Sequence, residues 1–193
     1  MTGVLVLCTA NICRSPMTES LLSARLGALG AAVPVRSAGT SAAGATTAGA
    51  QEAPVPEAIA ALAARGHDIS GHRSRPVRAA DLADADLILG LAREHVRYAV
   101  VLAPAAWPRT FTLKELVRRG RQIGPRLPGE PLPSWLERAG SGRDHRDLLG
   151  GSSQDDVADP FGGPAPGYEF VADLLDQLTD ELADLCWGLT PDR

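Results

Sequence analysis

Short apolar runs alternate with longer stretches of helical periodicity along this chain. Runs of Val, Ile and Leu too short for helices predict strands at 4–7, 33–36, 86–91 and 109–111. Apolar residues recurring every three or four positions predict helices at 16–29, 57–65, 93–103, 113–119 and 168–187. In 16–29 the stripe consists of Leu22, Leu26 and Leu29, and we expect it to pack on the sheet.

The alternation of strands and helices indicates the class of fold. We expect an α/β fold of three layers, in which helices cover both faces of a four-stranded parallel sheet. The length of 193 residues suits one domain that spans 1–193. The segment 120–153 is the exception, because it is rich in Gly and Pro and only 132–138 can form a turn of helix. We expect a long loop insertion there.

The first predicted strand runs directly into a loop that carries reactive side chains. Cys8 opens the loop and Arg14 closes it, and Ser15 and Pro16 are typical of the N-cap and first position of a helix. A loop that closes on a helix N-terminus points backbone N–H groups inward and binds anions. The same amides would stabilise a thiolate on Cys8, and the planar guanidinium of Arg14 can hold two oxygens of an oxyanion. These parts predict a nucleophile that faces a bound phosphoryl group.

This loop reads Cys-Thr-Ala-Asn-Ile-Cys-Arg-Ser-Pro from Cys8 to Pro16, and it resembles the phosphate loop of the low-molecular-weight protein tyrosine phosphatases. The resemblance implies a flavodoxin-like sheet and hydrolysis of phosphotyrosine through a phosphocysteine, with no metal or other cofactor. It makes Cys8 the nucleophile and Arg14 the phosphate binder. The phosphate-binding loop that it implies consists of Thr9, Ala10, Asn11, Ile12, Cys13, Arg14 and Ser15.

Asp159 is the candidate general acid. A carboxylic acid near the loop can protonate the leaving alcohol and then activate water. Asp159, Pro160 and Phe161 precede the last predicted helix and resemble the family's late Asp-Pro-aromatic motif, although tyrosine usually stands where Phe161 does. Asp155 and Asp156 are fall-back candidates, for which a solvated loop carboxylate is the alternative interpretation.

Two further residues are expected to support the loop. Asn11 suits a position of positive φ, and in the family this asparagine is braced by a serine after the second strand and by a later histidine. Ser37 and His72 match those positions, with a strand-end hydroxyl and a surface turn histidine as the alternatives. Ser15 is expected to cap the helix and to offer its hydroxyl to the Cys8 sulfur as it leaves.

The other cysteines have two possible uses. The resemblance supports a reversible disulfide between Cys13 and an oxidised Cys8, although a small buried residue would fit Cys13 equally well. Cys186 is expected to pack in the last helix. Three cysteines do not make a disulfide framework.

The chain departs from the family pattern at several positions. Ala10 replaces the usual glycine, Ala92 stands where an acidic residue often lies beside the cleft, and the loop 40–54 lacks the aromatic residue that typically lines it. Phosphoarginine phosphatases resemble this loop but carry threonine at the position of Ile12. Isoleucine therefore favours phosphotyrosine.

Two other functions remain open. A thiol-dependent arsenate reductase shares this fold and loop but typically needs a pair of cysteines beyond the middle of the chain, where only Cys186 is found. A non-catalytic module that binds phosphoproteins would keep the loop without turnover. The presence of a nucleophile, an arginine and a candidate acid together argues against it.

The composition and net charge of the chain indicate which kinds of binding partner to expect. Apolar residues make up 45% of the chain and charged residues 22%, as in ordinary globular proteins. A net charge of −4 gives no support for nucleic-acid binding, and no apolar run approaches the length of a membrane span. No signal peptide is recognisable, so we expect a cytoplasmic protein. We expect a monomer that acts on a phosphotyrosine-containing protein or a small phosphomonoester.

Overall fold

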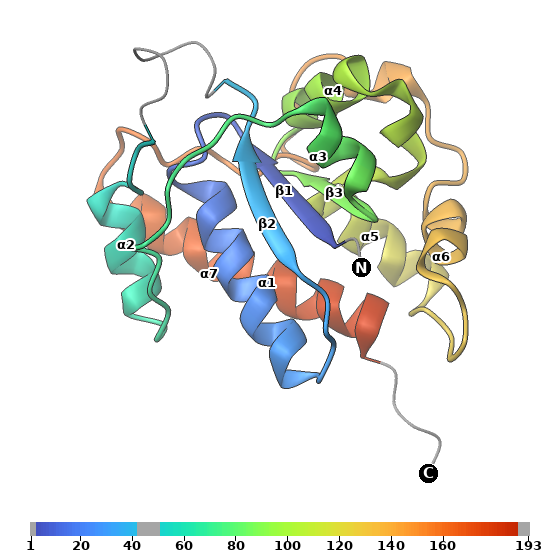
Figure 1. Cartoon of the computed structure of the whole chain (residues 1–193), viewed down its shortest axis with the longest axis horizontal. Helices are drawn as coiled ribbons and strands as arrows, with labels where there is room; N and C mark the ends of the chain where they lie inside the picture. Colours follow the sequence, from blue (N-terminus) through green and yellow to red (C-terminus); the bar gives the residue numbers. More distant parts are fainter. Residues whose placement is uncertain (1–2, 42–50, 189–193) are drawn as a thin grey trace.

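A four-stranded sheet lies at the centre of the computed structural model, which describes residues 3–41 and 51–188 (Figure 1). Residues 42–50 of the loop expected at 40–54 lie outside the described residues. The strands are β1 (Val4–Cys8), β2 (Val35–Gly39), β3 (Leu87–Gly90) and β4 (Thr110–Thr112). The helices are α1 (Arg14–Ala28), α2 (Pro56–Ala63), α3 (Ala79–Asp84), α4 (Arg93–Leu102), α5 (Leu113–Ile123), α6 (Leu132–Ala139) and α7 (Ala165–Trp187), with 3-10 turns η1 (Pro104–Arg109) and η2 (His145–Leu148).

The four strands are parallel and follow the order β2-β1-β3-β4. Successive residues of β1 face opposite sides of the sheet. Val4 and Val6 join the larger core, which α1, α2, α5 and α7 complete, whereas Leu5 and Leu7 join the smaller core under α3, α4 and η1. Figure 1 shows α1 and α7 on one side of the sheet and α3 and α4 on the other. The three-layer α/β fold expected from the sequence is therefore confirmed.

The carboxyl end of β2 is covered by a segment that comes from further along the chain. Cys8 of β1 lies opposite Gly39 of β2. On the outer side of β2, the Gly39 N–H donates to the Arg75 carbonyl at 2.8 Å, and the Val77 N–H donates to the Gly39 carbonyl at 2.9 Å. Pro76 is thereby paired with Gly39 in a one-residue parallel bridge. This bridge holds Arg75 beside the loop that follows β1.

The segment 120–153 contains more structure than the sequence suggested. The helix expected at 132–138 is present as α6, but α5 also continues to Ile123 and a 3-10 turn forms at η2. Trp135 on α6 is 0% exposed, and its indole N–H donates to the Gly124 carbonyl at 3.0 Å. The long loop insertion expected at 120–153 is therefore a loop only in part, because α5 extends into it, α6 and η2 form within it, and Trp135 packs it into the larger core.

Helix α1 begins earlier than expected, and one helix was not predicted. Helix α1 begins at Arg14, so Ser15 lies inside its first turn and Cys13 is the N-cap residue, with no side-chain cap. Leu29 follows the helix and is 37% exposed, while Leu22 and Leu26 are buried as expected. Helix α3 was not predicted, because only Leu82 of its six residues is buried. No helix within 3–41 or 51–188 has the length and apolar character that crossing a bilayer requires.

Candidate active site

The loop after β1 forms a cup around the Cys8 sulfur. Asn11 has a φ of 60°, a left-handed conformation that asparagine tolerates better than most residues. This turn directs the Asn11 N–H at the Cys8 Sγ, 3.3 Å away. The Ser15 Oγ lies 2.9 Å from the same sulfur. The hydroxyl of Ser15 is thus used at the sulfur and not as the helix cap expected from the sequence.

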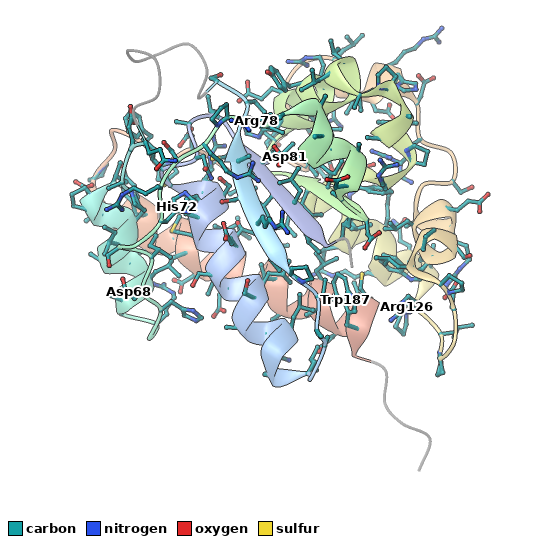
Figure 2. The ribbon with its side chains drawn as sticks, viewed as in Figure 1. Asp68, His72, Arg78, Asp81, Arg126 and Trp187 are labelled. Atoms are coloured by element: carbon teal, nitrogen blue, oxygen red, sulfur yellow. The ribbon has the colours of Figure 1, made fainter. Side chains whose placement is uncertain are left out.

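Asn11 is the centre of the hydrogen bonds that hold this cup. Its side-chain amide donates to the Ser15 Oγ at 2.9 Å and to the Ser37 Oγ at 2.8 Å. Its side-chain oxygen accepts from the Arg75 N–H at 3.0 Å. The Nε2 of His72 lies 3.0 Å from the Asn11 carbonyl oxygen, near the start of α1 (Figure 2). The structure therefore brings Ser37 and His72 to the residue that they were expected to brace.

Arg14 is buried at the back of the cup, where its side chain is 5% exposed. One terminal nitrogen donates to the Val157 carbonyl at 3.0 Å. The other donates to the Thr9 Oγ1 at 3.3 Å and to the Asp159 Oδ2 at 2.5 Å. The side chain of Asp159 is 45% exposed, so this carboxylate lies where the cup opens to solvent. The predicted acid and the predicted phosphate binder are thus in direct contact.

A cavity of about 200 Å³ opens above the cup. Its lining consists of Cys8, Thr9, Ala10, Ile12, Cys13, Arg14, Asp159 and Phe161. Cys8 is 3% exposed, whereas Phe161 is 62% exposed and stands at the rim. The side of Cys8 that faces the cavity is therefore within reach of a small group such as phosphate.

The two fall-back acids are already engaged. Asp155 is 4% exposed and accepts hydrogen bonds from the guanidinium groups of Arg93 and Arg118. Asp156 accepts from the Arg93 N–H at the start of α4 at 2.7 Å. The interpretation of both as solvated loop carboxylates was wrong. The Val157 N–H also donates to the Leu91 carbonyl. We call residues 155–157 the clamp, because their contacts fix the chain two residues before Asp159.

The remaining cysteines are buried thiols. Burial, followed by the charge of Asp159, raises the pKa of Cys13 to about 12. Burial also raises the pKa of Cys186, which is 0% exposed in α7 as its expected packing role requires. All three cysteines of the described chain are free. Within 3–41 and 51–188, no three His, Cys, Asp or Glu side chains gather as a metal site would need.

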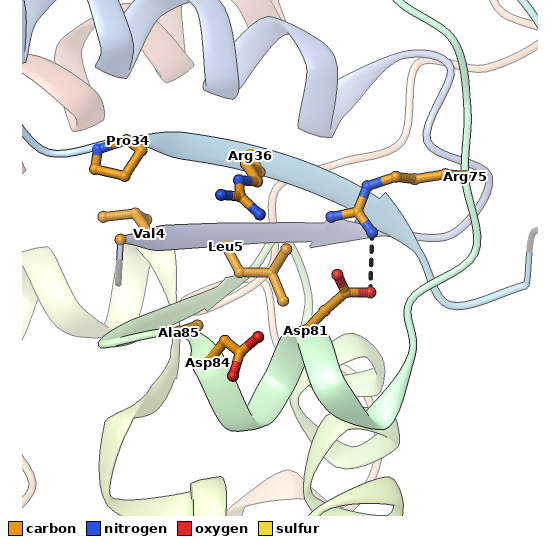
Figure 3. Close-up of a pocket in the computed structure, with 9 residues that line it drawn as sticks. Val4, Leu5, Pro34, Arg36, Arg75, Asp81, Asp84 and Ala85 are labelled. Atoms are coloured by element: carbon orange, nitrogen blue, oxygen red, sulfur yellow. Dashed lines mark hydrogen bonds and ion pairs between the residues drawn. The ribbon is translucent and has the colours of Figure 1, made fainter. Parts of the chain in front are cut away.

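A second cavity of about 200 Å³ lies at the amino end of β1, beside α3 (Figure 3). Arg36, Arg75, Asp81 and Asp84 line it above the apolar floor of Leu5, and Arg75 pairs with Asp81 at 2.9 Å. It contains no nucleophile. Arg75 lines only this second cavity, but its backbone N–H donates to the Asn11 side chain and so connects it to the loop after β1.

Known proteins resemble this chain in sequence and in fold. A protein-arginine-phosphatase of Geobacillus stearothermophilus is 30% identical over 181 residues, which cover 94% of this chain and 93% of that protein. The low molecular weight protein-tyrosine-phosphatase Etp of Escherichia coli K12 is 28% identical over 183 residues, which cover 94% and 92% of the two chains.

Solved structures of phosphatases also resemble this chain in fold. A low molecular weight protein tyrosine phosphatase from T. tengcongensis has 31% identity and a TM-score of 0.69, with 95% of this chain and 99% of that chain covered. A cysteine-to-serine mutant of the YwlE arginine phosphatase, which carries a phosphorylated active-site serine, has 27% identity and a TM-score of 0.70 over 95% and 94% of the chains. The profile described as "Low molecular weight phosphotyrosine protein phosphatase" matches residues 3–125. The chain therefore belongs to the low molecular weight phosphotyrosine protein phosphatase family.

Proposed function

We propose that this phosphatase hydrolyses phosphotyrosine in proteins, and small aryl phosphates, through a phosphocysteine on Cys8. The observation that carries the proposal is the convergence of Cys8, Arg14 and Asp159 on one cavity. The phosphoryl oxygens would accept hydrogen bonds from Arg14 and from the inward amides of the loop. A nucleophile, an anion clamp and an acid in one cavity are the parts that phosphoryl transfer to sulfur requires.

In the first step the Cys8 sulfur attacks phosphorus and the bond to the leaving oxygen breaks. Asp159 donates a proton to that oxygen, so tyrosine leaves as a neutral phenol. In the second step Asp159 takes a proton from water, the water oxygen attacks phosphorus, and the sulfur–phosphorus bond breaks. The Ser15 hydroxyl, 2.9 Å from Cys8 Sγ, can donate to the sulfur as it leaves with the electron pair. The products are inorganic phosphate and the original thiolate.

Binding of substrate must rearrange the contact between Arg14 and Asp159. The guanidinium nitrogen that holds Asp159 also faces the cavity, so a phosphoryl group competes with the carboxylate for it. Displacement frees Asp159 to face the leaving oxygen. The contact from Arg14 to the Val157 carbonyl need not change in this exchange.

The substrate class depends on the lining of the cavity. One relative is named a protein-arginine-phosphatase and another a protein-tyrosine-phosphatase, and their sequence identities to this chain are 30% and 28%. Sequence similarity alone therefore does not choose between the two substrates. Ile12 lines the cavity where phosphoarginine phosphatases carry threonine, and Phe161 at the rim offers an apolar surface to an aromatic ring. We therefore expect phosphotyrosine peptides to be preferred over phosphoarginine peptides. Ile12→Thr should move the ratio of the two kcat/KM values toward phosphoarginine, and an unchanged ratio would contradict this assignment.

Hydrolysis of p-nitrophenyl phosphate without added metal tests the proposed roles. Cys8→Ser should abolish turnover, and Asp159→Asn should lower kcat by about 100-fold, the usual contribution of a general acid. Both variants should remain folded, although Asp159→Asn removes the carboxylate that pairs with the buried Arg14 and should lower the melting temperature. Wild type that binds phosphate but never turns over would favour the binding module. Arsenate-dependent consumption of a thiol, lost in Cys186→Ala, would favour the reductase.

The same proposal includes a reversible oxidation. A peroxide would oxidise the Cys8 thiolate to a sulfenic acid, and the Cys13 thiol would then displace water to form the disulfide. Both residues line the cavity. Inactivation by peroxide should be reversed by a thiol reductant in wild type and become irreversible in Cys13→Ala. A cytoplasmic monomer remains our expectation for the protein in the cell.

A further inference from the structure

His95 lies beside the catalytic loop but takes no part in the proposed steps. It stands in the first turn of α4, and its side chain is 0% exposed. Its Nε2 lies 3.1 Å from the Thr9 Oγ1, and the same oxygen accepts a hydrogen bond from Arg14 at 3.3 Å. Two contacts therefore join a buried imidazole to the guanidinium proposed to bind phosphate.

The protonation of His95 follows from its surroundings. Burial, followed by the charge of Arg14, lowers the pKa of His95 to about 3, so the ring is neutral near pH 7. A neutral imidazole carries one hydrogen, on Nδ1 or on Nε2. Nδ1 is buried and has no hydrogen-bond partner among the described residues. An orphaned buried N–H is rarer than an unused acceptor, so we place the hydrogen on Nε2, which then donates to the Thr9 Oγ1.

This assignment determines where the hydrogen of the Thr9 hydroxyl points. Its oxygen accepts from both Arg14 and His95, which uses its two acceptor sites. Its hydrogen is then free to point at the Glu94 Oε1, 3.5 Å away. We propose that His95 is a positioning residue of this phosphatase, which holds Arg14 through the Thr9 hydroxyl in the orientation that binds the phosphoryl group. The inference rests on the proposed role of Arg14.

The Thr9 contact gains importance when substrate enters. Incoming phosphate displaces Asp159 from Arg14, and the contacts to the Val157 carbonyl and the Thr9 Oγ1 then remain among those seen in the described chain. A guanidinium binds two phosphoryl oxygens only when its plane faces them. Loss of one of the two remaining contacts lets that plane rotate and weakens phosphate binding.

A double-mutant cycle tests the chain of contacts. Thr9→Val and His95→Leu should each lower kcat/KM for p-nitrophenyl phosphate, and the calorimetric affinity for inorganic phosphate, by about tenfold, the effect of one lost hydrogen bond. The double variant should fall no further than Thr9→Val, because the proposed route from His95 to Arg14 runs through that hydroxyl, although His95 Nε2 also lies 3.4 Å from the Glu94 Oε1. His95→Gln, whose amide nitrogen can replace Nε2, should recover activity to within about threefold of wild type.

Val96→Ala is the matched control. Val96 is the next residue of α4 and is also 0% exposed, so its truncation should lower the melting temperature without weakening phosphate binding. Should His95→Leu fail to fold, His95→Asn, whose amide is too short to reach Thr9, takes its place in the cycle. Additive losses, or wild-type phosphate affinity in His95→Leu, would overturn the positioning role. An inactive wild type would instead overturn the proposed function.

Discussion

The contacts of Asp155 in the clamp allow a quantitative prediction, because Asp155→Asn removes a buried charge and keeps the shape of the side chain. Asp155 is 4% exposed and accepts hydrogen bonds from Arg93 and Arg118. Breaking one side of a buried ion pair costs about 3–5 kcal/mol. The side chains of Arg93 and Arg118 are 21% and 33% exposed, so water can solvate them in part. We therefore expect Asp155→Asn to lower the free energy of unfolding by about 2–3 kcal/mol at pH 7.

The stability difference between wild type and Asp155→Asn should depend on pH. Burial raises the pKa of Asp155, but hydrogen bonds from Arg118 and Arg93 outweigh burial, so the pKa of Asp155 in the folded protein lies below its ordinary value. A depressed pKa contributes stability that is fully present above the unfolded pKa of about 4 and is lost as the pH falls through the folded pKa. The gap between wild type and Asp155→Asn should therefore be widest near neutral pH and close in acid.

Urea denaturation followed by tryptophan fluorescence, at neutral and acid pH, measures this gap. Asp173→Asn is the control, because Asp173 pairs with Arg65 on the surface and its side chain is 64% exposed. Its effect should stay below about 1 kcal/mol. A difference of similar size for Asp155→Asn at pH 7, or a gap that persists unchanged in acid, would refute the clamp.

Two other substitutions test separate parts of the structure. Asn11→Ala removes the amide that braces Ser15 and Ser37, and it should lower kcat/KM for p-nitrophenyl phosphate by about 100-fold through misplacement of the loop; a loss of less than about threefold would mean that the cup holds without it. Trp135→Ala should cost about 3–5 kcal/mol in urea denaturation because Trp135 is 0% exposed, whereas a cost near zero would return 120–153 to the status of a loop.

The loop after β1 was predictable because its chemistry is local in sequence. The spacing from Cys8 to Ser15 fixes which groups can face one anion, and the strand before it and the helix after it follow from apolar periodicity. The supporting positions Ser37 and His72 were found only through the family resemblance. No periodicity links them to Asn11, because they lie in separate segments of the chain.

The misjudged parts depend on contacts between distant segments. Asp155 reads as a loop acid until Arg93 and Arg118 are brought to it from two helices. Trp135 stands among Gly and Pro residues, so its burial against the core is invisible in a local pattern. His95 did leave a signal, because it shares the inward face of α4 with Ala99, one helical turn away. A polar residue at an inward position is a reason to search for its partner.

The bridge between Gly39 and Pro76 also affects the outer edge of the sheet. An unpaired outer strand is a template on which a strand of another molecule can add. At the carboxyl end of β2 that vacancy is filled from within the molecule, and the filling residue, Pro76, has no N–H to offer a newcomer. The addition of a strand is thereby disfavoured at the end of β2 that lies beside Cys8.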